Sequence, residues 1–365
     1  MIRARSVRRD LRFIRPAVTS RGALTVKETY YIGLTDTSRP GVEGIGECAL
    51  FRGLGCDDRP DYAAMVNLVC DSFNTSRELP DLTPWPSIRF GVEMALRSLQ
   101  AGGNGIVWPS EWTRGVGQGI KINGLVWMDS PDRMEKSAFA KAENGFDCIK
   151  FKIGACDFNA EVRMIERLRR QYGPDRVEIR LDANGAWRDD DEAIARLRRL
   201  APLDIHSLEQ PIKARNEEMM QCVVANSPIP IALDEELIGR DPDTEATRLL
   251  DLIRPAYIIL KPSLCGGFSG AERWIAEADR LGIGSWATSA LESNIGLNAI
   301  AQWTARNGIP AMPQGLGTGA LYRNNIESPL RLDGQYLRFD PTAATAGPFD
   351  LADSTAATCP TPTSP

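Results

Sequence analysis

Four charged residues stand at nearly even intervals through the middle of the chain, and each follows a short apolar run. They are Asp182, Glu209, Asp234 and Lys261, separated by 27, 25 and 27 residues. One strand, one helix and two loops occupy a stretch of that length, so each charged residue would end one repeat unit. The spacing predicts a (β/α) barrel with functional groups at the carboxyl ends of its strands.

Length and composition fit such a barrel together with a further domain. The 365 residues match a barrel of about 250 residues plus a domain of about 100. Hydrophobic residues make up 43% and charged residues 25%, which is typical of a soluble globular protein with a large core. The eight cysteines form no Cys-x-x-Cys pair, so neither a zinc ribbon nor a redox motif is indicated.

Charge and apolar patterning argue against several classes of partner. The net charge of -5 and the pI near 5.3 leave no basic field for nucleic acid. No stretch approaches the roughly 20 apolar residues of a membrane span, and the first residues lack the apolar segment of a secretion signal. We therefore expect a cytoplasmic protein without nucleic-acid or membrane partners, while its oligomeric state stays open.

The first third of the chain predicts an α+β domain. Residues 2–15 and 27–36 are rich in strand formers, and the segment 18–23 is expected to join them as a hairpin-like connection. Helical periodicity follows at 60–73 and 87–101. Strands first and helices afterwards indicate a domain distinct from the rest of the chain.

From residue 120 onward, strand and helix patterns alternate without interruption. Eight strands with helical segments between them imply a closed parallel barrel. The strands are expected over 120–127, 148–153, 177–182, 205–209, 229–233, 257–261, 284–289 and 311–316.

These patterns divide the chain into four parts. We expect the α+β domain over 1–115 and the barrel over 116–330. A final strand over 331–340 is expected to return to the first domain as part of a segment 331–345. Residues 346–365 are rich in Ala, Thr, Pro and Ser, which predicts a flexible tail.

Three carboxylates at neighbouring strand ends indicate a metal site. Asp182, Glu209 and Asp234 each end an apolar strand where the carboxyl face of the barrel would begin. Their charges would repel one another unless a cation lay between them. Ligation by oxygen alone favours Mg²⁺, with Mn²⁺ as a substitute. The alternative is that each acid is an independent helix cap or surface residue.

Two lysines at the end of the preceding strand are candidates for proton transfer. Side chains alternate along a strand, so Lys150 and Lys152 face the same side, roughly 6 to 7 Å apart. Like charges at that distance, together with a nearby Mg²⁺, would lower a lysine pKa toward the range of a base. Lys152, the outer of the two, is the candidate general base, and a surface ion pair is the alternative.

Lys261 ends a nearly all-apolar strand, which is costly for a charge without an anionic partner. It would approach the site from the side opposite Lys152, a layout suited to removing a proton next to a carboxylate. The only histidine, His206, lies three residues before Glu209, so alternation places it on the opposite face of the strand. A structural role is favoured for it, and a Ser-His-Asp triad is disfavoured.

Together, these strand-end motifs resemble the enolase superfamily over about residues 8–340, in particular its muconate-lactonizing-like subgroup. The motifs are Lys-x-Lys at 150–152, Asp-x-Asn at 182–184, Glu-Gln-Pro at 209–211, Asp-Glu at 234–235 and Leu-Lys-Pro at 260–262. The resemblance implies an α/β fold: a modified TIM barrel, (β/α)7β, with an N-terminal α+β capping domain completed by a C-terminal segment.

The same resemblance implies roles for individual residues. Asp182, Glu209 and Asp234 would hold Mg²⁺, and Lys152 and Lys261 would form the catalytic pair. The substrate would be a small-molecule carboxylate. Its contacts would come from Arg21, Lys150, Asn184, Thr288, Ser289 and Gly317.

Four further segments are similar to the o-succinylbenzoate synthase family of menaquinone biosynthesis. They are Thr288–Gly296, Gly315–Tyr322 and two capping elements expected to face the substrate, Gly44–Cys48 and Thr19–Gly22. The similarity implies dehydration of 2-succinyl-6-hydroxy-2,4-cyclohexadiene-1-carboxylate (SHCHC) to o-succinylbenzoate. Lys152 would remove the α-proton and Lys261 would stabilise the dienolate.

Two alternatives within and beyond the superfamily stay open. Dipeptide epimerases carry an Asp-x-Asp pair on the eighth strand, whereas this chain has Gln314–Gly317 there, and an N-succinylamino acid racemase would not need that pair. A barrel that binds a metal or metabolite without turnover is the alternative of another class. Glu236 stands where relatives often carry serine, and the roles of Glu235 and Glu236 are left open.

Overall fold

The computed structural model describes residues 1–19, 22–306, 310–343, 345 and 347–349. Arg21, a predicted substrate contact, and residues 350–365 of the predicted tail lie outside the described residues. Within the described residues, no helix has the length and apolar character needed to cross a membrane.

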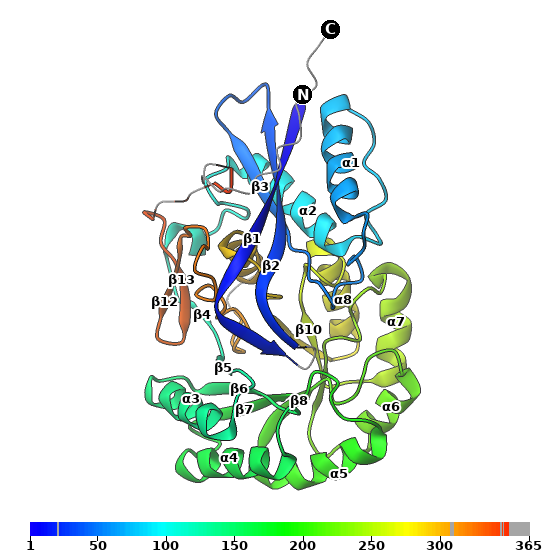
Figure 1. Ribbon diagram of the computed structural model, residues 1–365, viewed down its shortest axis with the longest axis vertical. Helices are drawn as coiled ribbons and strands as arrows, with labels where there is room; N and C mark the ends of the chain where they lie inside the picture. Colours follow the sequence, from blue (N-terminus) through cyan, green and yellow to red (C-terminus); the bar gives the residue numbers. More distant parts are fainter. Residues whose placement is uncertain (20–21, 307–309, 344, 346, 350–365) are drawn as a thin grey trace.

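The N-terminal unit is an antiparallel sheet covered by two helices (Figure 1). The strands are β1 (Ile2–Thr19), β2 (Gly22–Asp36) and β3 (Glu43–Cys48), and the helices are α1 (Tyr62–Thr75) and α2 (Pro86–Ala101). Strand β3 was missing from the sequence prediction, whereas both helices lie close to their predicted ranges. The core of this unit is formed by buried apolar side chains, among them Ile32, Leu34, Leu50, Val66, Val69, Ile88 and Ala95.

Two glycines allow helix α2 to lie directly on strand β3. A Cβ atom at Gly46 would come within 1.8 Å of the carbonyl oxygen of Gly91, and one at Gly91 within 2.6 Å of the Cys48 sulfur. Only glycine permits so close an approach of two backbones. The glycines of the segment Gly44–Cys48 therefore serve packing inside the N-terminal unit, and the expectation that this segment faces the substrate is wrong.

Seven parallel strands form the main sheet, in the order β11-β10-β9-β8-β7-β6-β5. They are β5 (Gly124–Val126), β6 (Cys148–Lys152), β7 (Glu178–Asp182), β8 (Ile205–Glu209), β9 (Ile231–Leu233), β10 (Tyr257–Leu260) and β11 (Gly284–Ala287). The helices are α3 (Pro131–Glu143), α4 (Phe158–Gln171), α5 (Asp190–Leu200), α6 (Glu217–Asn226), α7 (Pro242–Ile253), α8 (Gly267–Arg280) and α9 (Asn294–Ala305). Short 3-10 helices lie at Trp112–Arg114 and Ala201–Leu203.

The eighth position of the ring is filled by an extended segment rather than by the strand predicted over 311–316. Isolated parallel bridges join Gln314 to Ile122 and Gly315 to Thr288. On one side the Gln314 amide donates to Lys121 O at 2.8 Å, and on the other the Gly315 amide donates to Ala287 O at 2.8 Å. Pro313 has no N–H group and the following glycines are weak strand formers, which limits the ladder to this contact.

The segment after the barrel forms a hairpin, not the single strand predicted over 331–340. Strand β12 (Leu330–Asp333) pairs with β13 (Tyr336–Phe339), and β13 pairs with β4 (Ile120–Lys121), not with the N-terminal sheet. The turn contains Gly334 with φ of 57°, a conformation that glycine adopts without strain. The chain contacts the N-terminal sheet before this hairpin, where Tyr322 forms an isolated antiparallel bridge with Phe13 of β1. It meets the sheet again after the hairpin at Pro348, whose carbonyl oxygen accepts from Arg9 Nε at 2.6 Å.

Two carboxylates of the N-terminal unit fix it to barrel helices. Glu93 of α2 accepts from the backbone amides of Phe268 at 2.7 Å and Ser269 at 3.1 Å, at the start of α8. Glu47 of β3 accepts from the amides of Ser293 at 2.9 Å and Gly296 at 2.8 Å, at the start of α9. Unpaired amides and the helix dipole make a helix N-terminus a favourable place for a carboxylate.

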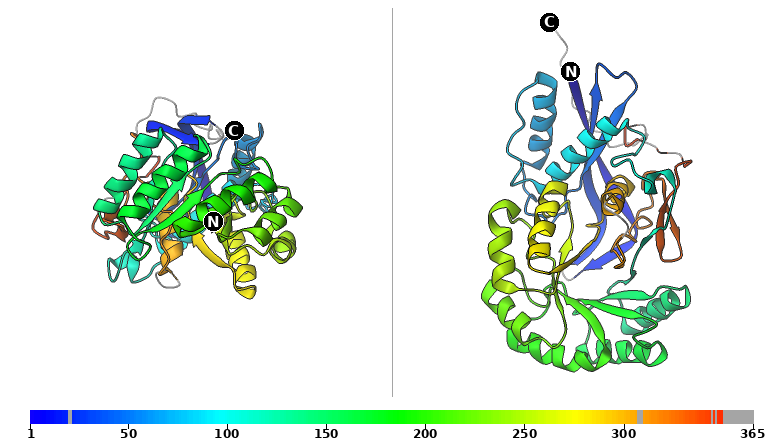
Figure 2. Two further views of the ribbon diagram at one scale, coloured as in Figure 1. Left: turned by 90° about the horizontal axis from the view of Figure 1, so that it is seen from below. Right: turned by 180° about the vertical axis from the view of Figure 1, so that it is seen from behind.

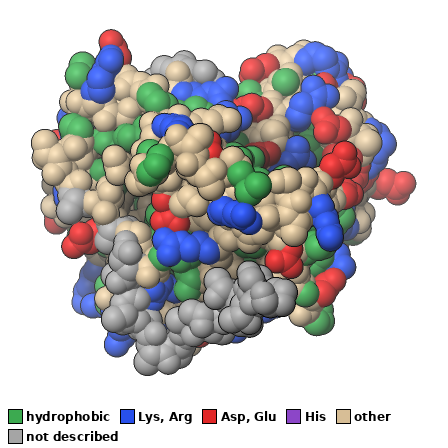
Figure 3. All heavy atoms as spheres, turned by 90° about the horizontal axis from the view of Figure 1, so that it is seen from above, with side chains coloured by type: hydrophobic (Ala, Val, Ile, Leu, Met, Phe, Trp, Pro, Cys, Tyr) green, Lys and Arg blue, Asp and Glu red, His purple; other side chains and the backbone are tan. Residues whose placement is uncertain are grey.

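These contacts hold the N-terminal unit, hereafter the cap, over the barrel. Helix α2 lies beside α8 both in the front view (Figure 1) and in the view from behind (Figure 2). Seen from the cap end, Lys and Arg side chains are interspersed with Asp and Glu (Figure 3). The architecture agrees with the predicted α/β fold, a modified TIM barrel with an N-terminal α+β cap.

Candidate active site

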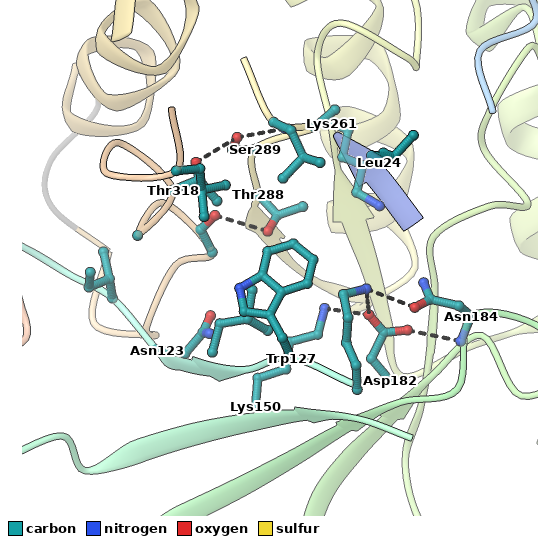
Figure 4. A pocket seen from close by; sticks show the side chains of 18 of the residues that line it. Leu24, Asn123, Trp127, Lys150, Asp182, Asn184, Lys261, Thr288, Ser289 and Thr318 are labelled. Carbon is teal, nitrogen blue, oxygen red and sulfur yellow. Dashed lines mark hydrogen bonds and ion pairs between the residues drawn. The ribbon is translucent and has the colours of Figure 1, made fainter. Parts of the chain in front are cut away.

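A cavity of about 450 Å³ lies between the strand ends of the barrel and the cap. Figure 4 shows Lys150, Asp182 and Asn184 on one side of it and Thr288, Ser289 and Thr318 on another. Of the predicted site residues that the structure describes, it is lined by Lys150, Lys152, Asp182, Asn184, Lys261, Thr288, Ser289 and Gly317.

Lys150 lies between two carboxylates at the base of this cavity. Its Nζ is 3.0 Å from Asp182 Oδ2 and 2.6 Å from Glu209 Oε2. Burial alone would lower the pKa of Lys150, but the charges of Asp182 and Glu209 outweigh it, so that this pKa is raised. Among the protein groups alone, the two carboxylates therefore favour the ammonium form of Lys150, whereas the expected lowering of a lysine pKa depends on a bound Mg²⁺ as well.

Lys152 lies on the same face of β6 as Lys150, two residues closer to the carboxyl end of the strand. Its Nζ donates to Asp182 Oδ2 at 2.9 Å and to Asn184 Oδ1 at 2.7 Å. Asn184 has φ of 46°, a left-handed conformation that asparagine tolerates better than most residues. The backbone N–H of Asn184 donates to Asp182 Oδ1 at 3.0 Å. The turn after β7 therefore directs Asp182 Oδ2 and Asn184 Oδ1 toward Lys152.

Lys261 follows β10, four strands away from the β6 strand of Lys152 in the sheet order. Its Nζ forms a short ion pair with Asp234 Oδ2. Burial opposes the charge of Lys261, yet the carboxylate of Asp234, and then that of Glu235, raises its pKa. The ammonium form is thereby favoured at the side of the cavity opposite Lys152.

The three predicted metal ligands are buried, with Asp182, Glu209 and Asp234 at most 2% exposed. The pKa of Asp182 is lowered: burial opposes this, but the charges of Lys150 and Lys152 prevail. The pKa of Glu209 is raised to about 8, by burial and then by the charge of Asp182. Two adjacent buried acids thus have opposite protonation tendencies.

The carboxylates are turned toward the lysines rather than toward one another. Within the part of the chain that the structure describes, no group of three or more Asp, Glu, His or Cys side chains is arranged to hold a metal. The donor set still fits a hard divalent cation, because it consists of carboxylate oxygens from neighbouring strands. In addition, Glu209 Oε1 is buried and has no hydrogen-bond partner among the described residues.

The far wall of the cavity is formed after β11 and at the eighth position. Thr288 Oγ1 donates to Gly315 O at 3.1 Å, and Thr318 Oγ1 donates to Ser289 Oγ at 2.8 Å. Thr318 was missing from the predicted site, although it belongs to the segment whose family resemblance was noted.

Other lining residues were also missed by sequence reasoning. Asn123 and Trp127 come from the first barrel strand region, and Leu24 and Phe51 come from the cap. Lys152 Nζ lies 6.0 Å from the centre of the Trp127 ring. The end of the first strand offered a signal for Trp127. Gly22, the last residue of the cap segment expected to face the substrate, lines the cavity as well. No local pattern pointed to Leu24 or Phe51, because their position depends on how the cap docks.

Glu235 and Glu236, whose roles were left open, differ in their surroundings. Glu235 lines the cavity, and its Oε1 accepts from Asn184 Nδ2 at 3.2 Å. Glu236 is fully buried and accepts from the Arg215 amide at 3.1 Å and from Arg240 Nη2 at 3.4 Å. Glu236 therefore belongs to a buried ion-pair network outside the cavity.

His206 lies inside the barrel, so its predicted placement on the opposite face of the strand from Glu209 is wrong. The pairing of β7 with β8 shifts register at this point, with Ile179 opposite Ile205 but Arg180 opposite Ser207. Strand β8 thus has one extra residue at this point, which interrupts the regular alternation of its side chains between the two faces of the strand. The His206 ring stacks on Tyr257 with centroids 5.0 Å apart, away from the cavity-lining residues.

Comparison with known proteins places the chain among related enzymes. A family model described as "Enolase C-terminal domain-like" matches residues 133–341. The o-succinylbenzoate synthase of Desulfotalea psychrophila is 42% identical, over 90% of this chain and 97% of that protein.

Solved structures show the same relationship. The crystal structure of MenC from Desulfotalea psychrophila matches with a TM-score of 0.82 and 39% identity, covering 92% of this chain and 99% of that chain. A dipeptide epimerase from Enterococcus faecalis, complexed with Mg and a dipeptide, shares the fold with a TM-score of 0.75 and 19% identity, covering 94% of this chain and 98% of that one. The resemblance inferred from the strand-end motifs is confirmed: the chain belongs to the enolase C-terminal domain-like family.

Proposed function

We propose that the protein is an o-succinylbenzoate synthase that dehydrates SHCHC to o-succinylbenzoate. The observation that carries the proposal is one cavity lined by Lys152 and Lys261 from strands four apart, with Asp182 beside Lys152. Support comes from the Desulfotalea psychrophila relative of that name, which is 42% identical over 97% of its own length.

In this proposal Asp182, Glu209 and Asp234 hold Mg²⁺, or Mn²⁺ in its place. When bound, the ion would offset the charge of the substrate carboxylate and stabilise the additional negative charge that develops on it as the proton leaves. The oxygen donors and the unpartnered Glu209 Oε1 support the assignment, as does the neighbour of the same fold that was solved with Mg.

Lys152 acts first, as a neutral amine. It takes the proton from the ring carbon that bears the carboxylate, and the electron pair of that C–H bond moves into a dienolate. Asp182 and Asn184 hold the Lys152 nitrogen in place through its two hydrogen bonds. Lys261, kept as an ammonium by Asp234, stabilises the developing negative charge from the other side.

The second step restores the enzyme. The electron pair of the dienolate forms the aromatic ring as the C–O bond to the ring hydroxyl breaks. The departing hydroxide takes the proton from the Lys152 ammonium and leaves as water, and Lys152 is again a neutral amine. No other reactant is consumed.

We further propose that substrate contacts come from Lys150, Asn184, Thr288, Ser289 and Gly317, all on the cavity wall, and from Arg21 of the cap. We assign the cap to 1–115, the catalytic barrel to 116–330 and a connecting segment to 331–345. The enzyme is proposed to act in the cytoplasm on a small-molecule carboxylate.

Conversion of SHCHC tests the proposal. Purified protein with Mg²⁺ should turn SHCHC into o-succinylbenzoate, followed by absorbance and by identification of the product. Absence of conversion by folded, Mg²⁺-loaded protein would refute the synthase assignment.

A racemase activity is favoured by one observation: the two lysines line opposite sides of one cavity, as two-base proton exchange requires. N-succinyl amino acids incubated in D₂O with the enzyme would reveal α-deuterium exchange. We expect this exchange to be slower than dehydration of SHCHC, and faster exchange would reverse the ranking of the two functions.

A further inference from the structure

Gln210 is a buried residue whose side chain joins two strand ends that carry proposed metal ligands. It directly follows Glu209 at the end of β8, is fully buried and does not line the cavity. Its Oε1 accepts from the backbone amide of Asp234 at 3.1 Å and from that of Glu236 at 3.3 Å. One side chain next to the second proposed ligand therefore holds the turn that begins with the third.

The backbone of Gln210 extends the same connection to the first proposed ligand. Its N–H donates to Ala232 O of β9 at 2.9 Å, and its carbonyl oxygen accepts from the Gly185 amide at 2.7 Å. Gly185 lies in the turn after β7, three residues after Asp182. Gln210 thus contacts the chain on both sides of β8, so the turns that carry Asp182 and Asp234 meet at one residue.

The conformation of Gln210 indicates that its place is enforced by these contacts. It has φ of 42°, a region that residues other than glycine seldom occupy and that persists where the surroundings enforce it. Its Nε2 donates to Ile212 O at 3.0 Å. Because the backbone amides can only donate and Ile212 O can only accept, one orientation of the side-chain amide satisfies all three bonds.

A second buried glutamine makes the same kind of bridge in another part of the barrel. Gln314 is 1% exposed. Its Oε1 accepts from the Ala287 amide at 2.7 Å, and its Nε2 donates to Met312 O at 2.6 Å. It joins β11 to the eighth position of the ring, and neither of these segments carries a proposed metal ligand. Comparing the two glutamines separates an effect on the metal site from the loss of a buried bridge between strands.

We propose that Gln210 is a positioning residue that sets the carboxylates of Asp182 and Asp234 relative to Glu209, so that the three can bind one divalent cation together. The inference rests on the proposed function in so far as it takes these acids as the metal ligands. Loss of Gln210 Oε1 would leave two buried amides unpaired and release the turn after β9. The third ligand would then no longer be held in place for the cation.

Binding of Mn²⁺ in the absence of substrate tests this, with Gln314→Met as the matched control for Gln210→Met. Titration calorimetry should show affinity for Mn²⁺ about 10- to 100-fold weaker in Gln210→Met, as is typical when a group that orients metal ligands is lost. Gln314→Met should bind Mn²⁺ within about twofold of the wild type. Equal weakening in both variants would attribute the effect to a less stable barrel and overturn the inference.

Amide hydrogen exchange measures the position of the turn without any metal. Exchange at the Asp234 and Glu236 amides should be about tenfold faster in Gln210→Met than in wild type, because both lose their acceptor. Gln314→Met should instead accelerate exchange at Ala287. Wild-type protection of Asp234 and Glu236 in Gln210→Met would mean that another group holds the turn, which would overturn the inference. If Gln210→Met does not fold, Gln210→Asn, which shortens the side chain by one methylene, is measured in its place with the same expected pattern.

These measurements are independent of SHCHC turnover. If the wild type does not convert SHCHC, the synthase assignment fails, but weaker Mn²⁺ binding by Gln210→Met alone would still support the role of Gln210. If the wild type binds no Mn²⁺, the metal assignment and this inference fail together. Wild-type affinity for Mn²⁺ in folded Gln210→Met would contradict the inference even if the protein is an active synthase.

Discussion

The two ends of the barrel interior both contain buried charged side chains, but only at one end do these side chains line the cavity. At the carboxyl ends of the strands lies the charged rim, which we define as Lys150, Lys152, Asp182, Glu209, Asp234 and Lys261. At the other end lies the floor, defined as Arg180, His206, Tyr257 and Trp286. All four floor residues are absent from the cavity wall, whereas four of the six rim residues line it.

In the floor, the charge is enclosed by its own partners. Arg180 is 1% exposed. It donates to Glu178 Oε1 at 2.6 Å and to Pro313 O at 2.9 Å, and its guanidinium carbon lies 4.3 Å from the centre of the Trp286 ring. Such an arrangement can stabilise the barrel, but it leaves little access to a substrate.

In the rim, the same kinds of ion pair border an open cavity. Lys152 and Lys261 each have a carboxylate partner and still face the space under the cap. Charges at the carboxyl ends of the strands can therefore meet a ligand, whereas charges at the amino ends support the fold.

Removal of the metal should have the largest effect on turnover. It should change only the rim, because all of the proposed metal ligands lie there. Because Asp182, Glu209 and Asp234 are proposed to hold Mg²⁺, chelation should lower kcat by about 10³-fold or more, and added Mg²⁺ should restore it. SHCHC turnover before and after treatment with EDTA measures this, with circular dichroism as the control for folding. Undiminished turnover in EDTA would show that the reaction does not depend on a metal ion.

Replacing the opposing ammonium should have the next largest effect. Lys261→Met should lower kcat by about 10²- to 10³-fold, because one preorganised charge beside the dienolate is lost. Steady-state kinetics with SHCHC measures the change. A fall in kcat/KM caused by KM alone would assign Lys261 to substrate binding instead.

A substitution in the floor should have the smallest effect on turnover and a clear effect on stability. Arg180→Met should lower the free energy of unfolding by about 1–3 kcal/mol, since the hydrogen bonds to Glu178 and Pro313 are lost. Urea denaturation measures the stability, and SHCHC kinetics should show kcat within about twofold of the wild type. A large loss of kcat in a protein that remains folded would mean that the two ends are not separate in function.

Much of the barrel could be predicted from the sequence because its strands are short apolar runs of regular spacing. The strand ends at Asp182 and Glu209 lie where the pattern placed them. The strand over 311–316 was not found, since Pro313 and the glycines after it weaken the ladder that apolar character alone suggested. The hairpin at 330–339 was also missed, although Asp333-Gly334 is a turn signal.

The candidate site was predictable where residues lie on strands and less so where they depend on tertiary contacts. Alternation correctly put Lys150 and Lys152 on one face of β6. The same rule misplaced His206, because a register shift in β8 cannot be read from periodicity. Leu24, Phe51 and Thr318 reach the cavity only through docking of the cap and the path of the eighth segment, which involve residues distant in sequence.

In the proposed mechanism, Lys152 of the charged rim removes a proton from the substrate. Turnover of SHCHC by Lys152→Ala, measured beside the wild type with saturating Mg²⁺, tests it most directly. We predict a folded protein whose kcat is lower by about 10²- to 10⁴-fold, the contribution typical of a general base. Near-native turnover by Lys152→Ala would contradict the claim.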